Sequence, residues 1–433
     1  MADRTVVTHV LRRATFGPTA AEIDRAAGRS IADVVSSLVR PAGSDAGAQA
    51  LPTNARDPIL SLTAQASRED RQRARQEARE QVQELAAAWM RRMATANHQL
   101  VEKMVFFWHG HWATSAQKVR SPSFMLGQLT TFRRSGMGDF AALAQAMVRD
   151  PALIVWLDGQ RNTSRAPNEN LARELMELFT LGIGAYGEPD VKQAARALTG
   201  WRIDRDSGGA VFVPGRHATG AKTILGTTAD YDAETLVDLL VGQPAHAPFL
   251  AGRLWHRFAS GQAPPADTVR RMTAAYGPGR DVGAMLTALL TDEAFLAARD
   301  QLVKQPVEWA VGAVRQLGID AVVLARARNG LRAMGQVPLR PPSVGGWPSG
   351  PAWLTTSSLQ ARLRVAATLA GALPDRTADL LATGDGDSRL VALARVLAVD
   401  AWTDRTRRAL TPAADRPRRL VTLALASPEY AVS

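Results

Sequence analysis

Two histidines, His109 and His111, stand one residue apart in the aromatic segment FFWHGHWATS (106–115). The chain has seven histidines and no cysteine, so a metal site would use imidazole and carboxylate ligands, which suit iron, manganese, zinc or copper alike. On a continuous helix the two imidazoles would diverge by about 200°, whereas a backbone break would let them converge. Gly110 lies between them and favours a helix end, so we predict that both bind a divalent transition metal. The alternative is two core histidines with satisfied ring nitrogens.

The segment PNENLARELMELFTLGIG (167–184) predicts a largely apolar helix that carries carboxylates. A buried carboxylate needs an opposite charge or a metal, because an unpaired charge is too costly to bury. We therefore predict Glu169 and Glu174 as further metal ligands and Glu177 as a general acid/base or a residue that orients a ligand. Arg173 is predicted as a catalytic residue that holds an anionic substrate group. The alternative is an Arg–Glu network that only links helices.

Four further residues complete the predicted site. Arg196, Trp201 and Lys222 are predicted to bind substrate, although Arg196 and Trp201 suit packing equally well. His217 lies in a turn context, where a lone histidine is usually solvated. It becomes a metal ligand only if its loop folds over the carboxylate helix.

Helical periodicity dominates the elements that must position these residues. The predicted fold class is all-α, with one large multi-helix globular domain over residues 1–433. A small β-hairpin insertion at about 208–226 is expected to pair AVFV (210–213) with KTIL (222–225). A long helix over 67–95 begins with a capping box and a charged, solvated half.

The connection 334–356 is rich in Pro, Gly and Trp, so it cannot be helical throughout, and its length makes it a functional-loop candidate. No motif of a phosphate-loop NTPase, zincin, α/β-hydrolase or Rossmann enzyme occurs.

The composition is that of a globular protein, with 46% apolar and 21% charged residues. No signal-peptide pattern and no apolar run of membrane-spanning length occurs, so we expect a cytoplasmic protein with no membrane contact. The net charge is +11, and 47 of the 52 basic residues are arginine. These arginines are dispersed, which argues against nucleic acid as a partner and suits an anionic small-molecule substrate.

Seven segments together resemble the DUF1800 family, in this order and over nearly the whole chain: HVLRRATFGPT, FWHGHWATS, PNENLARELMELFTLGIG, DVKQAARALTGW, RHATGAKTILG, VKQPVEW and PPSVGGWPSGPAWL. The resemblance implies a mostly helical bacterial protein, frequent export, and a neighbouring gene for a DUF1501-like (sulfatase-like) protein, which is the expected partner.

Position by position, the resemblance places the family's histidine pair on His109 and His111 and its loop histidine on His217. It places the family's polar helix residues on Asn168, Glu169, Asn170, Arg173, Glu174 and Glu177. The chain departs from the pattern at Gly110, where Asn is common, and at Ala218, where Asp is common. It also lacks the export signal.

We therefore expect a metal-dependent enzyme that acts on an anionic small molecule by oxidation, hydrolysis or group transfer. A metal-free enzyme would instead apply acid–base chemistry to a phosphorylated or carboxylated metabolite. A third hypothesis is a non-enzymatic binding or assembly module, with the helix at 67–95 as a partner-binding arm or homodimer contact.

Overall fold

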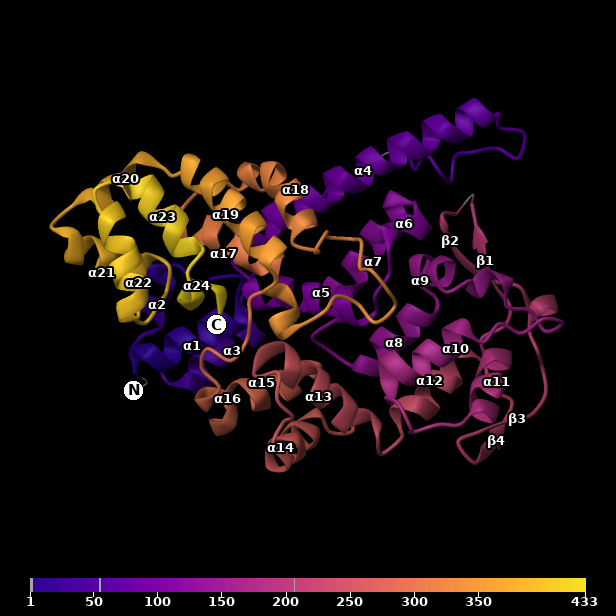
Figure 1. Cartoon of the computed structure of the whole chain (residues 1–433). Helices are drawn as coiled ribbons and strands as arrows, with labels where there is room; N and C mark the ends of the chain where they lie inside the picture. The colour runs from indigo at the N-terminus through magenta and orange to yellow at the C-terminus, as the bar shows by residue number, and fades with distance from the viewer. Residues whose placement is uncertain (1–2, 54–55, 206) are drawn as a thin grey trace.

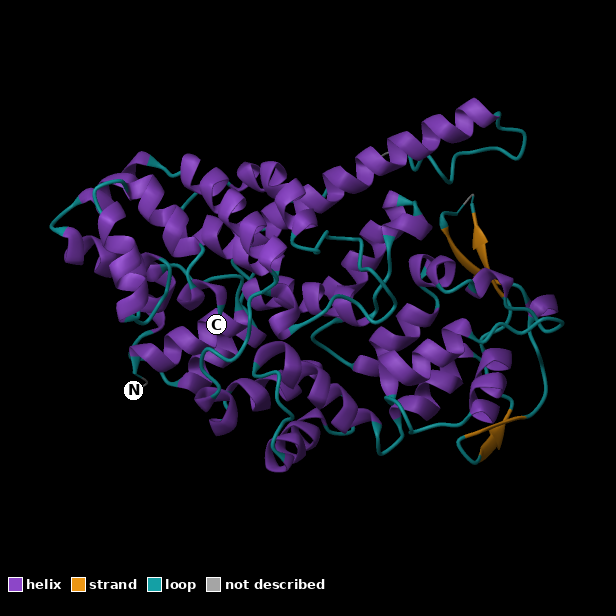
Figure 2. Ribbon diagram, in the orientation of Figure 1, coloured by secondary structure: helices purple, strands orange, loops and turns teal. Residues whose placement is uncertain are grey.

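The computed structural model describes residues 3–53, 56–205 and 207–433. Helices dominate these residues and strands form only two small sheets, so the predicted all-α class is confirmed (Figure 2). In chain order the α-helices are α1 (Arg4–Ala14), α2 (Ala20–Ala26), α3 (Ile31–Val39), α4 (Arg68–Thr95), α5 (Gln99–His111), α6 (Ala116–Val119), α7 (Pro122–Ser135), α8 (Phe140–Val148), α9 (Pro151–Trp156), α10 (Asn170–Glu174), α11 (Glu188–Ala197), α12 (Ala233–Val241), α13 (His246–Phe258), α14 (Ala266–Tyr276), α15 (Val282–Leu290), α16 (Glu293–Ala297), α17 (Pro306–Leu317), α18 (Leu324–Ala333), α19 (Thr356–Gly371), α20 (Asp375–Ala382), α21 (Gly386–Val396), α22 (Asp404–Leu410), α23 (Pro417–Leu425) and α24 (Pro428–Ala431).

Short helical segments and four strands complete the fold. The short segments are η1 (Gly159–Arg161), the π-helix η2 (Leu175–Thr180), η3 (Pro214–Arg216), η4 (Ala321–Val323), η5 (Gly350–Trp353) and η6 (Thr411–Ala413). The strands are β1 (Trp201–Asp204), β2 (Gly209–Phe212), β3 (Lys222–Ile224) and β4 (Thr227–Ala229).

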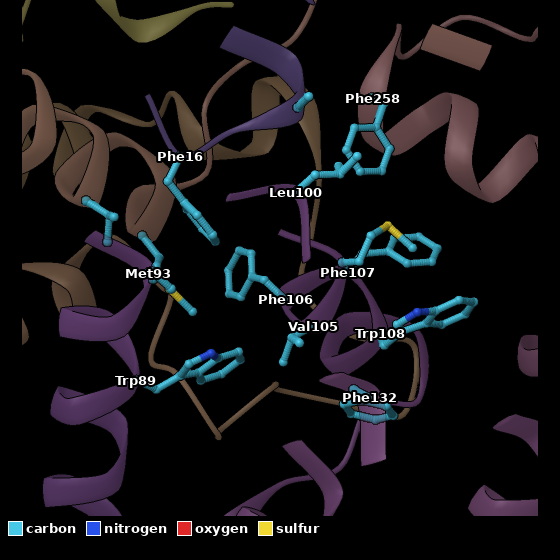
Figure 3. Packing of buried hydrophobic residues seen from close by; sticks show 14 of the residues in the cluster. Phe16, Trp89, Met93, Leu100, Val105, Phe106, Phe107, Trp108, Phe132 and Phe258 are labelled. Carbon is cyan, nitrogen blue, oxygen red and sulfur yellow. The ribbon is translucent and has the colours of Figure 1, made fainter. Parts of the chain in front are cut away.

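Helix α5 lies in the middle of the molecule, with α17–α24 on one side and α8–α12 with the strands on the other (Figure 1). Its aromatic side chains anchor the core. Phe106 lies 5.9 Å, centroid to centroid, from both Phe16 and Trp89, and these rings close around it (Figure 3). Burial of such large apolar side chains is the main stabilising term of a core, so α5 is fixed firmly in place.

Helix α4 begins as predicted. Ser67 Oγ accepts from the Asp70 amide at 3.0 Å, and Asp70 Oδ2 accepts from the Ser67 amide at 3.2 Å, which completes the capping box. The first half of α4 projects away from the other helices (Figure 1), and its second half enters the core with Leu85, Trp89 and Met93.

The predicted pairing of 210–213 with 222–225 is wrong. Instead β2 pairs antiparallel with β1, and β3 pairs antiparallel with β4. The turn between β3 and β4 holds Leu225 at φ 50° and Gly226 at φ 77°, and two central residues of positive φ close a two-residue hairpin. Each strand therefore pairs with its nearest neighbour across a short turn, and the segment between β2 and β3 only connects two hairpins.

The helix predicted at 167–184 is present, but its second half is the π-helix η2. The amides of Leu181 and Gly182 both donate to Met176 O, and Gly182 at φ 87° ends the element. The connection 334–356 has no helix between Ala333 and η5, as its composition predicts. Within the described part of the chain, no helix has both the length and the apolar character needed to cross a bilayer.

Candidate functional site

Helix α5 runs without a break through both histidines of the predicted metal pair. The Trp112 amide still donates to Trp108 O at 2.8 Å, so the helix end predicted at Gly110 is wrong. On this continuous helix the two imidazoles point to different neighbours. His109 lies edge-on between Trp89 and Trp347, with ring centroids 5.4 and 5.3 Å away.

His109 is fully buried, and neither of its ring nitrogens has a hydrogen-bond partner among the described residues. Burial lowers its pKa to about 3, so the ring is neutral. A neutral imidazole enclosed by two indoles is an aromatic packing residue in this structure.

His111 has a different contact, with the backbone of the π-helix. Its Nε2 lies 3.1 Å from Phe179 O, and His246 Nδ1 lies 2.9 Å from Thr180 O. A carbonyl oxygen only accepts, so each of these nitrogens is the protonated one. The two buried histidines therefore cap two carbonyls at the end of η2. Burial, and then Arg253, lowers the pKa of His111 well below its usual value.

The first predicted carboxylate belongs to a surface ion-pair network. Arg173 Nη2 donates to Glu169 Oε2 at 3.0 Å, and its Nη1 donates to Glu188 Oε1 at 2.6 Å. The hydrogen bond to Glu188 raises the pKa of Arg173 above its usual value. This arrangement is the Arg–Glu network between helices that was the alternative to a metal site, and it joins α10 to α11.

The other two carboxylates lie further along the same helix. Glu177 Oε2 accepts from the Tyr186 hydroxyl at 2.5 Å. Burial and then the charge of Glu177 raise the pKa of Glu174. The negative charges of Glu174 and Glu177, two residues of the predicted site, thus repel each other.

The predicted substrate-binding residues have contacts within the fold. Lys222 is buried and donates from Nζ to Asp230 Oδ1 at 2.7 Å, and Arg196 donates to Gln193 Oε1 at 2.7 Å. Trp201 packs against Phe212 across the β1–β2 pair with ring centroids 5.5 Å apart.

His217 is held at the end of α11. Its Nδ1 lies 3.0 Å from Thr199 O, and its ring packs 5.4 Å from the ring of Phe212. Among the described residues, no group of three or more His, Asp or Glu side chains is placed to hold a metal ion. The predicted ligand set of His109, His111, Glu169, Glu174 and His217 is therefore not gathered around one point.

The residues that do converge line a polar cavity of about 160 Å³ beside α5. Its walls come from the end of α1, from α5, α13 and the start of α17, and from the connection 334–356. Five cationic side chains and a single side-chain carboxylate line it: Arg12, Arg13, Lys103, Arg253, Arg257 and Glu308. We call this the basic cavity.

Glu308 is the centre of the basic cavity's ion pairs. Its carboxylate accepts from Arg257 at 2.7 and 3.1 Å and from Lys103 Nζ. Burial alone would raise its pKa, but Arg257 and Lys103 outweigh burial and hold the pKa of Glu308 well below its usual range. Burial lowers the pKa of Lys103 to about 8, against the opposing effect of Glu308. Lys103 is thus a buried amine whose pKa lies well below the usual value for lysine.

Two arginines of the basic cavity form no ion pair among the described residues. Arg13 is 2% exposed; its Nη2 donates to Ala298 O at 2.7 Å, while its Nε and Nη1 have no partner among the described residues. Burial, and then Arg12, lowers the pKa of Arg13 to about 9. Arg253 makes no ion pair within the described ranges, and burial lowers its pKa too. Buried donors without acceptors are costly, so they point to a ligand that supplies the acceptors.

None of these six residues was singled out from spacing, although three of them lie in the resembling segments. Arg12 and Arg13 belong to HVLRRATFGPT, and Glu308 to VKQPVEW. The connection 334–356 was singled out, and Gly345 and residues 347–350 of it line the basic cavity. Convergence of HVLRRATFGPT, FWHGHWATS, VKQPVEW and PPSVGGWPSGPAWL on one cavity is the signal that would have located it.

Comparison with protein families gives a match to the family described as "Protein of unknown function (DUF1800)", over residues 9–432. Comparison with curated proteins and with solved structures gives no match. The family match covers nearly all of the chain, including the six charged side chains of the basic cavity. The chain therefore belongs to the DUF1800 family.

Proposed function

We propose that the chain binds a small phosphorylated or carboxylated metabolite in the basic cavity and acts on it by acid–base chemistry. The observation that carries the proposal is Arg13, a buried arginine with two unpartnered nitrogens beside the unpaired Arg253. An anion with two or more oxygens would accept from both guanidinium groups, and bidentate contacts of this kind are the strong ones.

The size of the basic cavity limits the ligand. A cavity of about 160 Å³ is close to an engineered cavity of roughly 150 Å³ that holds benzene, so the enclosed part of the ligand has about six to ten non-hydrogen atoms. A phosphate or a short dicarboxylate fits this limit. The apolar wall from Phe106 and Phe107 contacts the remainder of the molecule.

Lys103 is the group best suited to move a proton. With a pKa of about 8, roughly a tenth of the amine is neutral at pH 7, and a pKa close to the working pH favours acid–base catalysis. Glu308 and Thr15 O hold its Nζ in place, the latter at 2.8 Å. An ammonium has three donors, so one remains for the ligand.

The test is calorimetric titration of the purified chain with inorganic phosphate and with malonate. Arg13→Gln and Arg253→Gln should each weaken binding about tenfold, as expected for loss of one charged hydrogen-bond donor. Arg364→Gln is the matched control, because Arg364 is exposed and does not line the cavity. Equal affinity in all variants, or no binding at millimolar anion, would refute the proposal.

The metal-dependent enzyme expected from the sequence stays a prediction, and the separation of its ligands does not support it. The assembly hypothesis likewise stays a prediction. So do a DUF1501-like partner, a homodimer through α4, and a cytoplasmic location.

A further inference from the structure

A second cluster of positive charge lies where the arm α4 leaves the core. A cavity of about 380 Å³ is lined by Arg75 and Arg79 of α4, Arg120 at the end of α6, and Arg340 of the connection 334–356. A smaller cavity of about 60 Å³ adjoins it, shares Arg340, and adds Arg328 and Arg332. We call these two cavities together the arginine cleft.

The positive charge of the arginine cleft is not compensated. No Asp or Glu lines either cavity, and within the described residues none of the six arginines forms an ion pair. Burial and the neighbouring Arg332, Arg79 and Arg328 lower the pKa of Arg340. Like charges held together destabilise a fold, so a cluster without acids is retained at a cost in stability.

The shape of the arginine cleft indicates a small molecule as its ligand. The larger cavity falls within the range of roughly 300–1,000 Å³ typical of metabolite sites. Its arginines come from three separate elements, so they surround a ligand instead of forming a flat stripe. The smaller cavity has an apolar wall that includes Met90, Leu331 and Val337, next to the shared Arg340.

We infer that the arginine cleft binds a small molecule that carries a diphosphate group, with the phosphates on Arg75, Arg79, Arg120 and Arg340 and an apolar portion in the smaller cavity. A diphosphate offers several oxygens and two or more negative charges, which matches several planar guanidinium forks better than a single carboxylate does. The site is separate from the basic cavity, since the two share no lining residue.

The test is calorimetric titration of the full chain with inorganic pyrophosphate at about 0.15 M salt, an ionic strength that screens exposed charges beyond about 8 Å. The double variant Arg79→Gln/Arg340→Gln should weaken pyrophosphate binding at least about tenfold. Its melting temperature should equal or exceed that of the unmodified chain, because two like charges are removed. Arg73→Gln is the matched control on α4, since Arg73 is exposed, pairs with Glu69 and lies outside the cleft. Arg13→Gln controls for the basic cavity.

Each other outcome counts against the inference. Unchanged pyrophosphate affinity in the double variant would show that pyrophosphate binds elsewhere. An equal loss of affinity in Arg73→Gln would show that binding depends on the overall positive charge and not on the arginine cleft. Citrate that binds as tightly as pyrophosphate would overturn the phosphate assignment. An acidic peptide that binds where pyrophosphate does not would make the cleft a protein contact.

Discussion

Replacement of Glu308 by Gln tests the electrostatics of the basic cavity most directly. Gln keeps the size of the side chain but removes the only side-chain carboxylate that lines the cavity beside the five cationic side chains. Breaking a buried ion pair typically costs about 3–5 kcal/mol, because the remaining charges are left without a partner. At roughly 2.1 cal/mol/K of unfolding entropy per residue, a chain of 433 residues should lose about 3–6 °C in melting temperature.

The pH dependence of this loss follows from the low folded-state pKa of Glu308. A depressed carboxyl pKa stabilises the fold above the unfolded-state pKa, near 4.3 for Glu, and this contribution is lost as the pH falls further. The difference in melting temperature between Glu308→Gln and the unmodified chain should therefore be constant between about pH 6 and 7, below the pKa of Lys103, and shrink below about pH 4. Thermal unfolding followed by circular dichroism over this range measures it.

Addition of inorganic phosphate distinguishes an anion-binding site from a cavity that has only lost an ion pair. With the carboxylate gone, inorganic phosphate should bind more tightly, and at a hundred times its Kd it should restore about 2.7 kcal/mol. Glu102→Gln is the matched control: Glu102 is also buried and accepts from Arg92 and Arg133, but it does not line the basic cavity. If phosphate restores both variants equally, or restores neither, the reasoning about the basic cavity is refuted.

Four further outcomes can be measured. Affinity for sulfate should fall as the pH rises through about 8, where Lys103 loses its proton, and Lys103→Met should abolish this pH dependence. His111→Phe leaves Phe179 O without its donor and should cost about 1–3 kcal/mol in unfolding free energy, while His109→Phe breaks no hydrogen bond and should cost less. Gly346→Ala should weaken phosphate binding in the basic cavity, because a Cβ there would lie 2.4 Å from Gly110 O at φ +85°, whereas Gly345→Ala, with its nearest contact at 3.7 Å, should not. Metal analysis of untagged protein should find less than about a tenth of an equivalent of iron, manganese, zinc or copper, and near-stoichiometric metal that is lost in His109→Ala would contradict our reading of the site.

The helices could be predicted because their signals are local. The capping box of α4 and the periodicity of its second half lie within one segment, and the structure confirms both. The predicted strand pairing was wrong because pairing depends on the turns. The apolar segments 210–213 and 222–225 suggested one hairpin, but the tight turn at Leu225 and Gly226 pairs β3 with β4 instead.

The basic cavity could not be predicted from spacing, because its residues are far apart in the chain. Arg13, Lys103, Arg257 and Glu308 come from four helices, and no local pattern joins them. Among 47 arginines, an unpaired one looks the same in sequence as a paired one. Arg173 and Arg13 differ only in the fold, where one has two carboxylate partners and the other has two nitrogens without any.

Gly110 shows how one residue type can carry two different signals. A glycine between two histidines at the end of an apolar run is typical of a helix end. It is equally typical of a place where another segment comes close. In this fold the connection 334–356 packs against α5 here, with Gly346 against the backbone of Gly110. Because α5 stays helical, His109 and His111 point in different directions. His109 packs between two indole rings, while His111 caps a carbonyl of the π-helix η2 beside the basic cavity. The chemistry expected from His109 and His111 thus depends on whether the helix continues through Gly110, which the spacing of the two histidines does not determine.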